Sequence, residues 1–327
     1  MKLKPMAAAA AIAAASGCIG THPAHAQDVD GYPTRPITMV LPYSPSGSGD
    51  RFARVLGQEV EKTLGQPIVI EYRAGGGTNI GTDYVVRSKP DGYTLLLAGT
   101  PLTVNPSLYK KLSFSVSDLA SITMVSISPY LVVTGPKLPV NTFQEFIAYA
   151  KANPNKVNYA SAGIGSGAHL AGALMNQMAG IDMNHISYKS SSQALTDLIG
   201  GQVQLNFSPL VVSTNMAEAG RLKALAVTSL KRSATLPNVP TVSESGLEGY
   251  EILGWYGIMA PKGTPDPIIQ KLNKAFVDAM HEPTVIKALA VDGIELIPGS
   301  PQDMDAFLKR TEKQAARIVQ LSGARIE

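Results

Sequence analysis

The chain has 327 residues and a mass of 34.4 kDa, which is enough for two domains or one large one. Apolar residues make up 45% and charged residues 16%, with 30 Gly and 23 Pro, which indicates a loop-rich globular protein and excludes a disordered one. The net charge of +3, without a basic cluster, argues against a nucleic-acid partner. A single cysteine excludes a disulfide framework and a thiolate metal cluster.

The first 26 residues have the pattern of a secretory signal peptide. Lys2 and Lys4 precede an apolar run over 6–15, which is about half the length that a helix needs to span a bilayer. Ala24-His25-Ala26 then gives the small-x-small pattern of a cleavage site. Cleavage before Gln27 would remove both lysines and leave a net charge of +1 in place of +3.

An alternative for this leader is a lipid-attachment site at Ala15-Ser16-Gly17-Cys18. We favour it less, because alanine stands where such sites usually carry leucine. Both interpretations predict an exported protein, and no other run of the sequence is long enough to span a membrane.

Beyond the leader, apolar β-branched runs alternate with helical patterns, which predicts an α/β fold with largely parallel sheets. Helices are expected over about 50–64, after residue 79, after the Gly-Ser loop at 161–167, and from Pro265 and Pro301. No long linker is visible, so a second domain must be joined by short crossings. The predicted strands are 37–41, 68–71, 95–98, 122–125, 131–134, one near Val157, 203–207, 225–228 and 252–260.

Three loops, at 43–49, 75–79 and 161–167, share one design. Each follows a predicted strand, is rich in Gly, Ser, Thr or Asn, and opens a predicted helix. Backbone N–H groups at such a helix N-terminus favour a carboxylate or phosphate, although the same residues also make ordinary turns and N-caps. The candidate ligand contacts in and near these loops are Tyr43, Ser44, Ser46, Gly77, Thr78, Asn79, Thr100, Ser161, Gly163, Gly165 and Ser166.

The sequence lacks the motifs of several common enzyme classes. Gly75, Gly77 and Gly81 are spaced one residue off the dinucleotide fingerprint, and neither a Walker A lysine nor a G-x-S-x-G nucleophile elbow occurs. Asp182 and Asp197 are an imaginable acid–base pair, but solvated carboxylates at helix ends are the favoured interpretation.

The histidines do not form a metal-binding pattern. His169, His185 and His281 are isolated, with no H-E-x-x-H and no cysteine partner, so we expect neither a metal nor a cofactor. His169 lies three residues after Ser166. A packed polar residue and a ligand contact are equally good interpretations of it.

Ordered motifs run through the whole chain after the leader. They are Tyr32-Pro33-x-Arg35-Pro36-Ile37, Leu64-Gly65-Gln66-Pro67, Gly76-Gly77-Thr78-Asn79-Ile80-Gly81, Pro90-Asp91-Gly92-Tyr93-Thr94, Asn105-Pro106-Ser107-Leu108-Tyr109, Tyr159-Ala160-Ser161-Ala162-Gly163, His169-Leu170-Ala171-Gly172, Tyr188-Lys189, Asp197-Leu198-x-Gly200-Gly201-Gln202, Leu236-Pro237-Asn238-Val239-Pro240 and Ala260-Pro261-x-Gly263-Thr264-Pro265. This series resembles the Bug/TctC family, the periplasmic solute-binding receptors of tripartite tricarboxylate transporters.

The resemblance implies a two-domain periplasmic binding protein of the Venus-flytrap, type II-like class, with the ligand cleft between two α/β domains. We expect one domain over 27–126 with 250–327 and the other over 127–249. It further implies a non-catalytic monomer without cofactor, which binds a small carboxylate through main-chain groups and hydroxyls and delivers it to a large and a small membrane subunit. The loops at 76–79 and 161–166 would anchor one carboxylate, helped by Thr78 and Ser166.

Two departures from the family pattern bear on the ligand. Ser208 stands where members that bind amino acids often carry an acidic residue, and Ser190-Ser191-Ser192 replaces a frequent Gly-Gly. The serines add donors for a second acidic group, or they are the N-cap of a helix. The expected ligand is therefore a dicarboxylate or an aromatic carboxylate such as terephthalate, with the ring of Tyr43 either against a flat ligand or packed on the domain surface.

Two other classes of function stay open. One is an exported hydrolase with an unrecognised Ser/His site, which would turn its ligand over. The other is a co-receptor that presents ligand to a sensor kinase. Neighbouring genes for two membrane subunits would favour transport over signalling.

Overall fold

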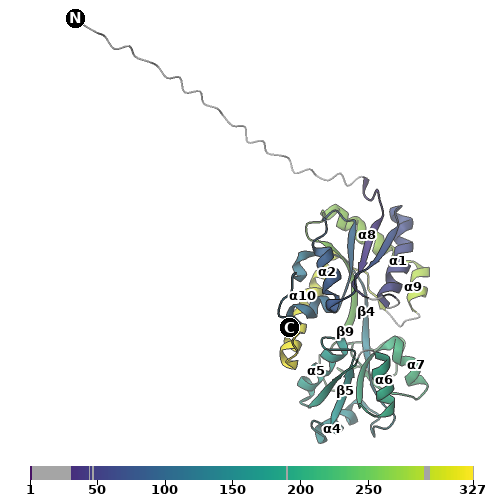
Figure 1. Cartoon of the computed structure of the whole chain (residues 1–327). Helices are drawn as coiled ribbons and strands as arrows, with labels where there is room; N and C mark the ends of the chain where they lie inside the picture. Colours follow the sequence, from purple (N-terminus) through teal and green to yellow (C-terminus); the bar gives the residue numbers. More distant parts are fainter. Residues whose placement is uncertain (2–30, 44, 46–47, 189–190, 291–294, 327) are drawn as a thin grey trace.

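The computed structural model describes residues 1, 31–43, 45, 48–188, 191–290 and 295–326 (Figure 1). Apart from Met1, the predicted signal peptide, with Cys18, lies outside these residues. Within the described ranges, no helix combines the length and the apolar character that a membrane crossing requires.

The first lobe is a sheet with helices on both faces, because the strands alternate apolar residues toward two separate cores. Helices α1, α8 and α9 cover one face, and α2, α3 and the start of α10 cover the other. The parallel strands are β2, β1 and β3 in spatial order, followed by antiparallel β9. The bounds are β1 Ile37–Leu41, α1 Ser48–Leu64, β2 Ile68–Tyr72, η2 Gly76–Thr78, α2 Asn79–Val86, β3 Thr94–Gly99, α3 Pro101–Leu108, η3 Val116–Asp118, β9 Leu253–Pro261, α8 Asp266–His281, α9 Pro283–Ala290, β10 Glu295–Leu296 and α10 Pro301–Ser322.

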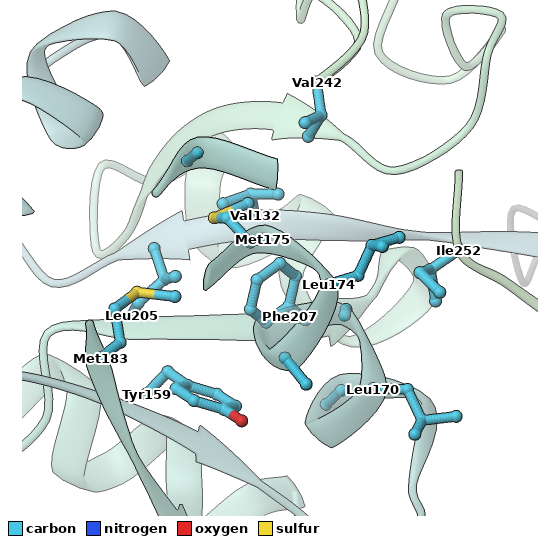
Figure 2. Packing of buried hydrophobic residues seen from close by; sticks show 14 of the residues in the cluster. Val132, Tyr159, Leu170, Leu174, Met175, Met183, Leu205, Phe207, Val242 and Ile252 are labelled. Carbon is cyan, nitrogen blue, oxygen red and sulfur yellow. The ribbon is translucent and has the colours of Figure 1, made fainter. Parts of the chain in front are cut away.

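The second lobe repeats this arrangement. Its sheet contains the parallel strands β7, β5 and β6. Figure 2 shows the core on the face that α5 covers, where Phe207 and Tyr159 lie below Met175. Helices α6 and α7 cover the opposite face. The bounds are α4 Phe143–Ala152, β5 Val157–Ser161, α5 Gly167–Ala179, β6 Met183–Ser187, α6 Ser191–Gly200, β7 Leu205–Pro209, α7 Leu210–Glu218 and β8 Lys223–Val227.

One long strand, β4 (Leu119–Thr134), runs through both lobes (Figure 1). It pairs antiparallel with β9 as far as Pro129, and with β7 and β8 from there on. Proline is tolerated here because the strand changes partners at this point. Two hydrogen bonds connect the segments that cross between the lobes near this point. The Tyr130 N–H donates to Thr228 Oγ1 (2.8 Å), and that hydroxyl donates to the carbonyl of Ile252 (2.6 Å).

Helix α10 also contacts both lobes. Met304 and Leu308, near its start, belong to a core of the first lobe, whereas Ile318 and Val319, near its end, belong to the core of the second. The chain then pairs with the segment after α3, where the Ile326 N–H donates to the carbonyl of Leu108 (2.8 Å). The lobes are therefore held together along this side of the molecule.

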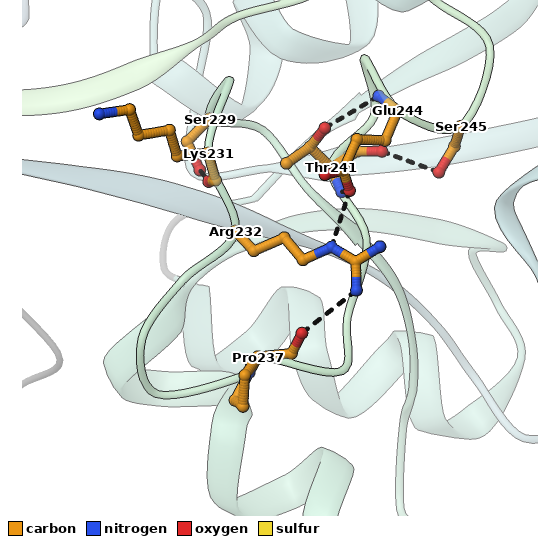
Figure 3. Close-up of polar contacts among 7 residues, drawn as sticks. All are labelled: Ser229, Lys231, Arg232, Pro237, Thr241, Glu244 and Ser245. Atoms are coloured by element: carbon orange, nitrogen blue, oxygen red, sulfur yellow. Dashed lines mark hydrogen bonds and ion pairs between the residues drawn. The ribbon is translucent and has the colours of Figure 1, made fainter.

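The segment between β8 and β9 has little regular secondary structure and is fixed by polar contacts (Figure 3). Arg232 Nε donates to Glu244 Oε2 (2.8 Å), and its Nη1 donates to the carbonyl of Pro237 (3.2 Å). Glu244 in turn accepts from the Thr241 N–H (3.0 Å). This network fixes the segment that connects β8 to β9, the strand by which the chain returns to the first lobe.

The α/β class predicted from the sequence is confirmed, but the sheets are less parallel than expected, because β4 and β9 run antiparallel to their neighbours. The separate strands expected at 122–125 and 131–134 are parts of the single strand β4. The first helix begins at Ser48 rather than near residue 50. The helices α3, α4, α7 and α9 and the short strands β6 and β10 were not predicted.

Candidate ligand-binding site

A cavity of about 260 Å³ lies between the lobes, at the carboxyl ends of the parallel strands. In open α/β sheets this edge is where ligands bind. The first lobe, the second lobe and β4 all contribute to its walls. The lining residues are Tyr43, Phe52, Thr100, Pro101, Ser126, Ser128, Tyr130, Gly165, Ser166, Gly167, Pro209, Gly254, Trp255 and Tyr256.

Three helices begin at the cavity. Pro101 is the first residue of α3, Gly167 is the first residue of α5, and Pro209 directly precedes α7. Ser166 is the N-cap of α5, with its Oγ accepting from the His169 N–H (3.3 Å). The first N–H groups of a helix lack partners within it and carry partial positive charge. None of the described lining residues is charged, so these helix ends are the main source of positive potential and favour an anion.

The crossing strand β4 forms the floor of the cavity. Ser126, Ser128 and Tyr130 alternate along it and therefore lie on one face. Gly254 of β9 pairs with Ser128 and leaves the floor open above it. Burial raises the pKa of Tyr130 to about 12, and the nearby Tyr256 adds to this effect, so the phenol is neutral and can donate.

Aromatic rings form the wall on the first lobe. The ring of Tyr256 lies 5.7 Å from that of Tyr43 and 5.3 Å from that of Phe52, between centroids. Burial raises the pKa of Tyr43 well above its ordinary value, so its phenol is also neutral. The cavity thus combines flat apolar surfaces with hydroxyl groups and helix N-termini.

Two glycines leave room for the tyrosine hydroxyls. A Cβ atom on Gly167 would lie 2.0 Å from Tyr130 Oη, and one on Gly99 would lie 2.3 Å from Tyr43 Oη. Any larger residue at either position would displace a ring that lines the cavity.

Four of the residues predicted from the sequence line this cavity together: Tyr43, Thr100, Gly165 and Ser166. Tyr43 follows β1, Thr100 follows β3, and the other two precede α5. Thr100 Oγ1 accepts from the Trp255 N–H (3.3 Å), which joins the end of β3 to the return strand.

The loop at 75–79 packs on α3 and does not line the cavity. Asn105 Nδ2 donates to the carbonyl of Gly77 (2.8 Å) and to Asn79 Oδ1 (2.7 Å). Thr78 has a positive φ of 79°, as do Gly76 and Gly77 directly before it. A role of Gly77, Thr78 and Asn79 in anchoring the ligand stays a prediction.

Ser161 and His169 are buried and form a polar cluster with the half-buried His185, and none of the three lines the cavity. Ser161 Oγ is 2.6 Å from His185 Nε2 and accepts from the Gly163 N–H (3.1 Å). The imidazoles of His169 and His185 lie 4.2 Å apart, and His169 Nδ1 accepts from the N–H of Gly165 (3.2 Å). His169 therefore shapes the loop that lines the cavity.

Burial keeps both imidazoles neutral. It lowers the pKa of His169, and burial together with the adjacent His169 lowers the pKa of His185 to about 4. The Ser161–His185 contact is a Ser–His pair, yet Ser161 is fully buried and neither residue lines the cavity. Within the described chain, no acidic side chain accepts a hydrogen bond from Ser161 or His185.

Of the remaining predicted contacts, those that the structure describes do not line the cavity. Ser208 is buried in β7, next to Pro209, and Ser191 is the first residue of α6. Ser44, Ser46 and Ser190 fall outside the described residues.

The sequence reasoning missed the floor of the cavity and most of its aromatic wall. Ser126, Ser128 and Tyr130 form a polar pattern of period two. The sequence contains this pattern, but the two strands predicted around Pro129, 122–125 and 131–134, leave these residues out. No local sequence pattern indicates that Trp255 and Tyr256 line the cavity, because they belong to an apolar strand.

No group of three or more metal-ligating side chains comes together in the part of the chain that the structure describes. The cavity has the composition of a site that holds a small anion by dipoles, hydroxyls and aromatic contact.

Two α/β lobes joined by crossing strands, with an anion-favouring cavity between them, define the class of two-domain solute-binding receptors. Residues 52–324 match the tripartite tricarboxylate transporter family receptor, TctC, and the chain belongs to this family. The protein BugT of Bordetella pertussis is 38% identical over 301 residues, which are 91% of this chain and 92% of that protein.

Solved structures agree with this assignment. The periplasmic binding protein BugD is 35% identical, with a TM-score of 0.75 over 90% of this chain and all of that chain. Rpa4515 of R. palustris, solved with adipate, is 31% identical, with a TM-score of 0.78 over the same shares. The resemblance stated from the sequence motifs is thereby confirmed.

Proposed function

We propose that this protein captures a small carboxylate outside the cytoplasm and delivers it to the membrane subunits of a tripartite tricarboxylate-type transporter. The observation that carries the proposal is the cavity between the lobes, where three helices begin and no described lining residue is charged. A carboxylate gains charge-assisted hydrogen bonds from such helix ends without a cationic side chain. The family assignment and the adipate bound to Rpa4515 support the same ligand class.

The ligand in this proposal is a dicarboxylate or an aromatic carboxylate, with terephthalate as one candidate. The rings of Tyr43, Phe52 and Tyr256 suit a flat or extended apolar body. An amino acid would bring an ammonium group into a cavity whose described lining offers no acidic side chain, and the loss of its hydration would be uncompensated.

The proposed setting is the periplasm, reached through the signal peptide at 1–26, with the mature protein a monomer that contacts a large and a small membrane subunit. We place the domain boundaries where β4 changes partners near Pro129 and where the chain returns near Ile252. This division is close to the one predicted from the sequence. Ligand that touches both lobes would favour their closed arrangement.

Binding without catalysis is part of the proposal. The Ser–His pair of Ser161 and His185 is the arrangement that a hydrolase would need, and its separation from the cavity supports a receptor instead. A co-receptor for a sensor kinase would use the same binding step, so the two roles differ in the partner and not in the site.

The test is a thermal-shift screen of about a hundred acids on refolded, ligand-free protein, because a ligand that binds only the folded state raises the melting temperature. We expect dicarboxylates or aromatic acids to stabilise the protein and to be recovered unchanged after incubation. Stabilisation by none of the acids, or their conversion at catalytic rates, would overturn the proposal. Stabilisation by glutamate or aspartate, without stabilisation by their deaminated counterparts, would reverse the ligand assignment alone.

A further inference from the structure

The hydroxyl groups on the floor of the cavity make no hydrogen bonds to other residues that the structure describes. Ser126 is 1% exposed and lines the cavity, and its Oγ makes no hydrogen bond to another described residue. Ser128 and Tyr130 are half-buried and also line the cavity, and neither Ser128 Oγ nor Tyr130 Oη makes a hydrogen bond within the part of the chain that the structure describes. A hydroxyl group that lines a cavity and makes no hydrogen bond within the protein is satisfied by solvent or by a ligand.

The period of the strand places these hydroxyls in one row. Ser126 pairs with Tyr256 and Ser128 with Gly254, so both serines face the cavity, whereas Ile127 between them packs into a core on the opposite face. The Cα atoms of Ser126 and Tyr130 are about 13 Å apart at the rise of an extended strand. Tyr130 Oη lies at the start of α5, and Ser126 lies at the end of the row toward the first lobe.

We infer that Ser126 and Ser128 form a second polar subsite, which hydrogen-bonds an oxygen-bearing group at the far end of an extended acid whose first carboxylate is held at the helix N-termini. This inference rests on the proposed function. Serine hydroxyls donate to carboxylate, hydroxyl or carbonyl oxygen, and they supply no counter-charge for an ammonium group. The subsite therefore selects against acids with an apolar tail and against acids with an amino tail.

The experiment compares acids that differ only at the far end. Hexanoate, 6-hydroxyhexanoate, adipate and 6-aminohexanoate form one series; benzoate, 4-hydroxybenzoate, terephthalate and 4-(aminomethyl)benzoate form an aromatic one. Affinities are measured by calorimetry on the wild type and on Ser126→Ala. The matched control is Ser121→Ala, because Ser121 lies on the same strand, is buried with an unpartnered hydroxyl, and does not line the cavity. Melting temperatures establish that the variants are folded.

In the series that binds, we expect the wild type to prefer the diacid over the apolar-tailed acid by about tenfold or more, as one to two hydrogen bonds to a charged group allow. Ser126→Ala removes about tenfold of affinity for the diacid and leaves the apolar-tailed acid unchanged, while Ser121→Ala changes neither. A hydroxyl-tailed acid that binds as tightly as the diacid also supports the subsite, with a neutral oxygen as its target.

Three results would overturn the inference while leaving the proposed function intact. They are equal binding of the apolar-tailed acid and the diacid by the wild type, an equal loss for both acids in Ser126→Ala, and tightest binding of the amino-tailed acid. Failure of every acid in both series to bind the wild type would instead contradict the proposed function, and the subsite with it.

Discussion

Gly167 is the residue at which the site tolerates least change. A Cβ there would lie 2.0 Å from Tyr130 Oη and 2.5 Å from Tyr130 Cζ, so the ring would have to move from its place on the cavity floor. We expect Gly167→Ala to destabilise the fold by about 1–3 kcal/mol, as overpacking does, and to weaken acid binding strongly. Urea unfolding and calorimetry measure the two effects.

Gly200→Ala is the matched control, since a Cβ at that helical position meets no atom within 4 Å. It should leave binding unchanged and stabilise the protein slightly, because alanine is the better helix former. Unaltered acid affinity in Gly167→Ala would show that Tyr130 is not held where the structure places it.

The His169–His185 pair makes stability depend on pH. The pKa of His185 is about 4 in the folded protein and about 6.5 when unfolded, so the unfolded state binds more protons between these values. The contribution of His185 to the free energy of unfolding is therefore fully present above about pH 6.5, and it is lost as the pH falls toward 4. Partial solvent exposure of His185 limits the loss to roughly 1–2 kcal/mol.

Urea titrations at pH 7.5, 6, 5 and 4.5 measure this dependence. His185→Gln keeps a partner for Ser161 Oγ and removes the titrating group, so its stability should change less over this range. A wild-type free energy of unfolding with the same pH dependence as that of the variant would contradict the assignment.

At the residue level, the sequence best predicted the cavity-lining residues that belong to a recognisable local motif. Thr100, Gly165 and Ser166 belong to turns between strand and helix, and such turns are visible as Gly- and Ser-rich stretches after an apolar run. Ser126 and Tyr256 come to the site only because β4 pairs with β9, which follows more than a hundred residues later. A contact of that kind depends on pairing between distant segments, and no local pattern specifies it.

Among the elements, α10 has the clearest energetic role outside the site. Ile318 is 1% exposed in the core of the second lobe, although the helix starts on the first lobe. We expect Ile318→Ala to cost about 2–5 kcal/mol in the free energy of unfolding, from lost burial and the cavity left behind. Leu321→Ala, on the same helix at 49% exposed, should cost less than about 1 kcal/mol.

Chemical denaturation of the two variants gives the comparison directly. Equal costs would mean that the end of α10 is not packed against the second lobe, and the bracing of the two lobes by this helix would then be wrong.

Element prediction succeeded for long periodic segments and failed at β4. The helices α1, α8 and α10 each have an apolar stripe and a start or stop signal, so their existence was clear from the sequence. Pro129 reads as a strand breaker, because it cannot donate to a ladder. The strand continues through it only because its partners change there, which is a property of the assembled fold.

For the whole molecule, the position of the cavity predicts a motion. α10 and the contacts of α3 hold the lobes together along one side, so closure must rotate them about that side and the crossing strand β4. An acid that contacts both lobes binds the closed form better and shifts the equilibrium toward it. Small-angle scattering should show a smaller radius of gyration at saturating ligand, and an unchanged radius would argue against closure.

The central claim is that the cavity between the lobes binds a carboxylate through helix N-termini and hydroxyls. The most direct test is a calorimetric titration of the ligand-free protein with the best-stabilising acid, and with its methyl ester at the anchored carboxylate. The acid should bind with one site per chain. The ester should bind at least tenfold more weakly, because charge-assisted bonds of about 1.5–3 kcal/mol each are weakened together. Equal affinities of acid and ester would contradict the account.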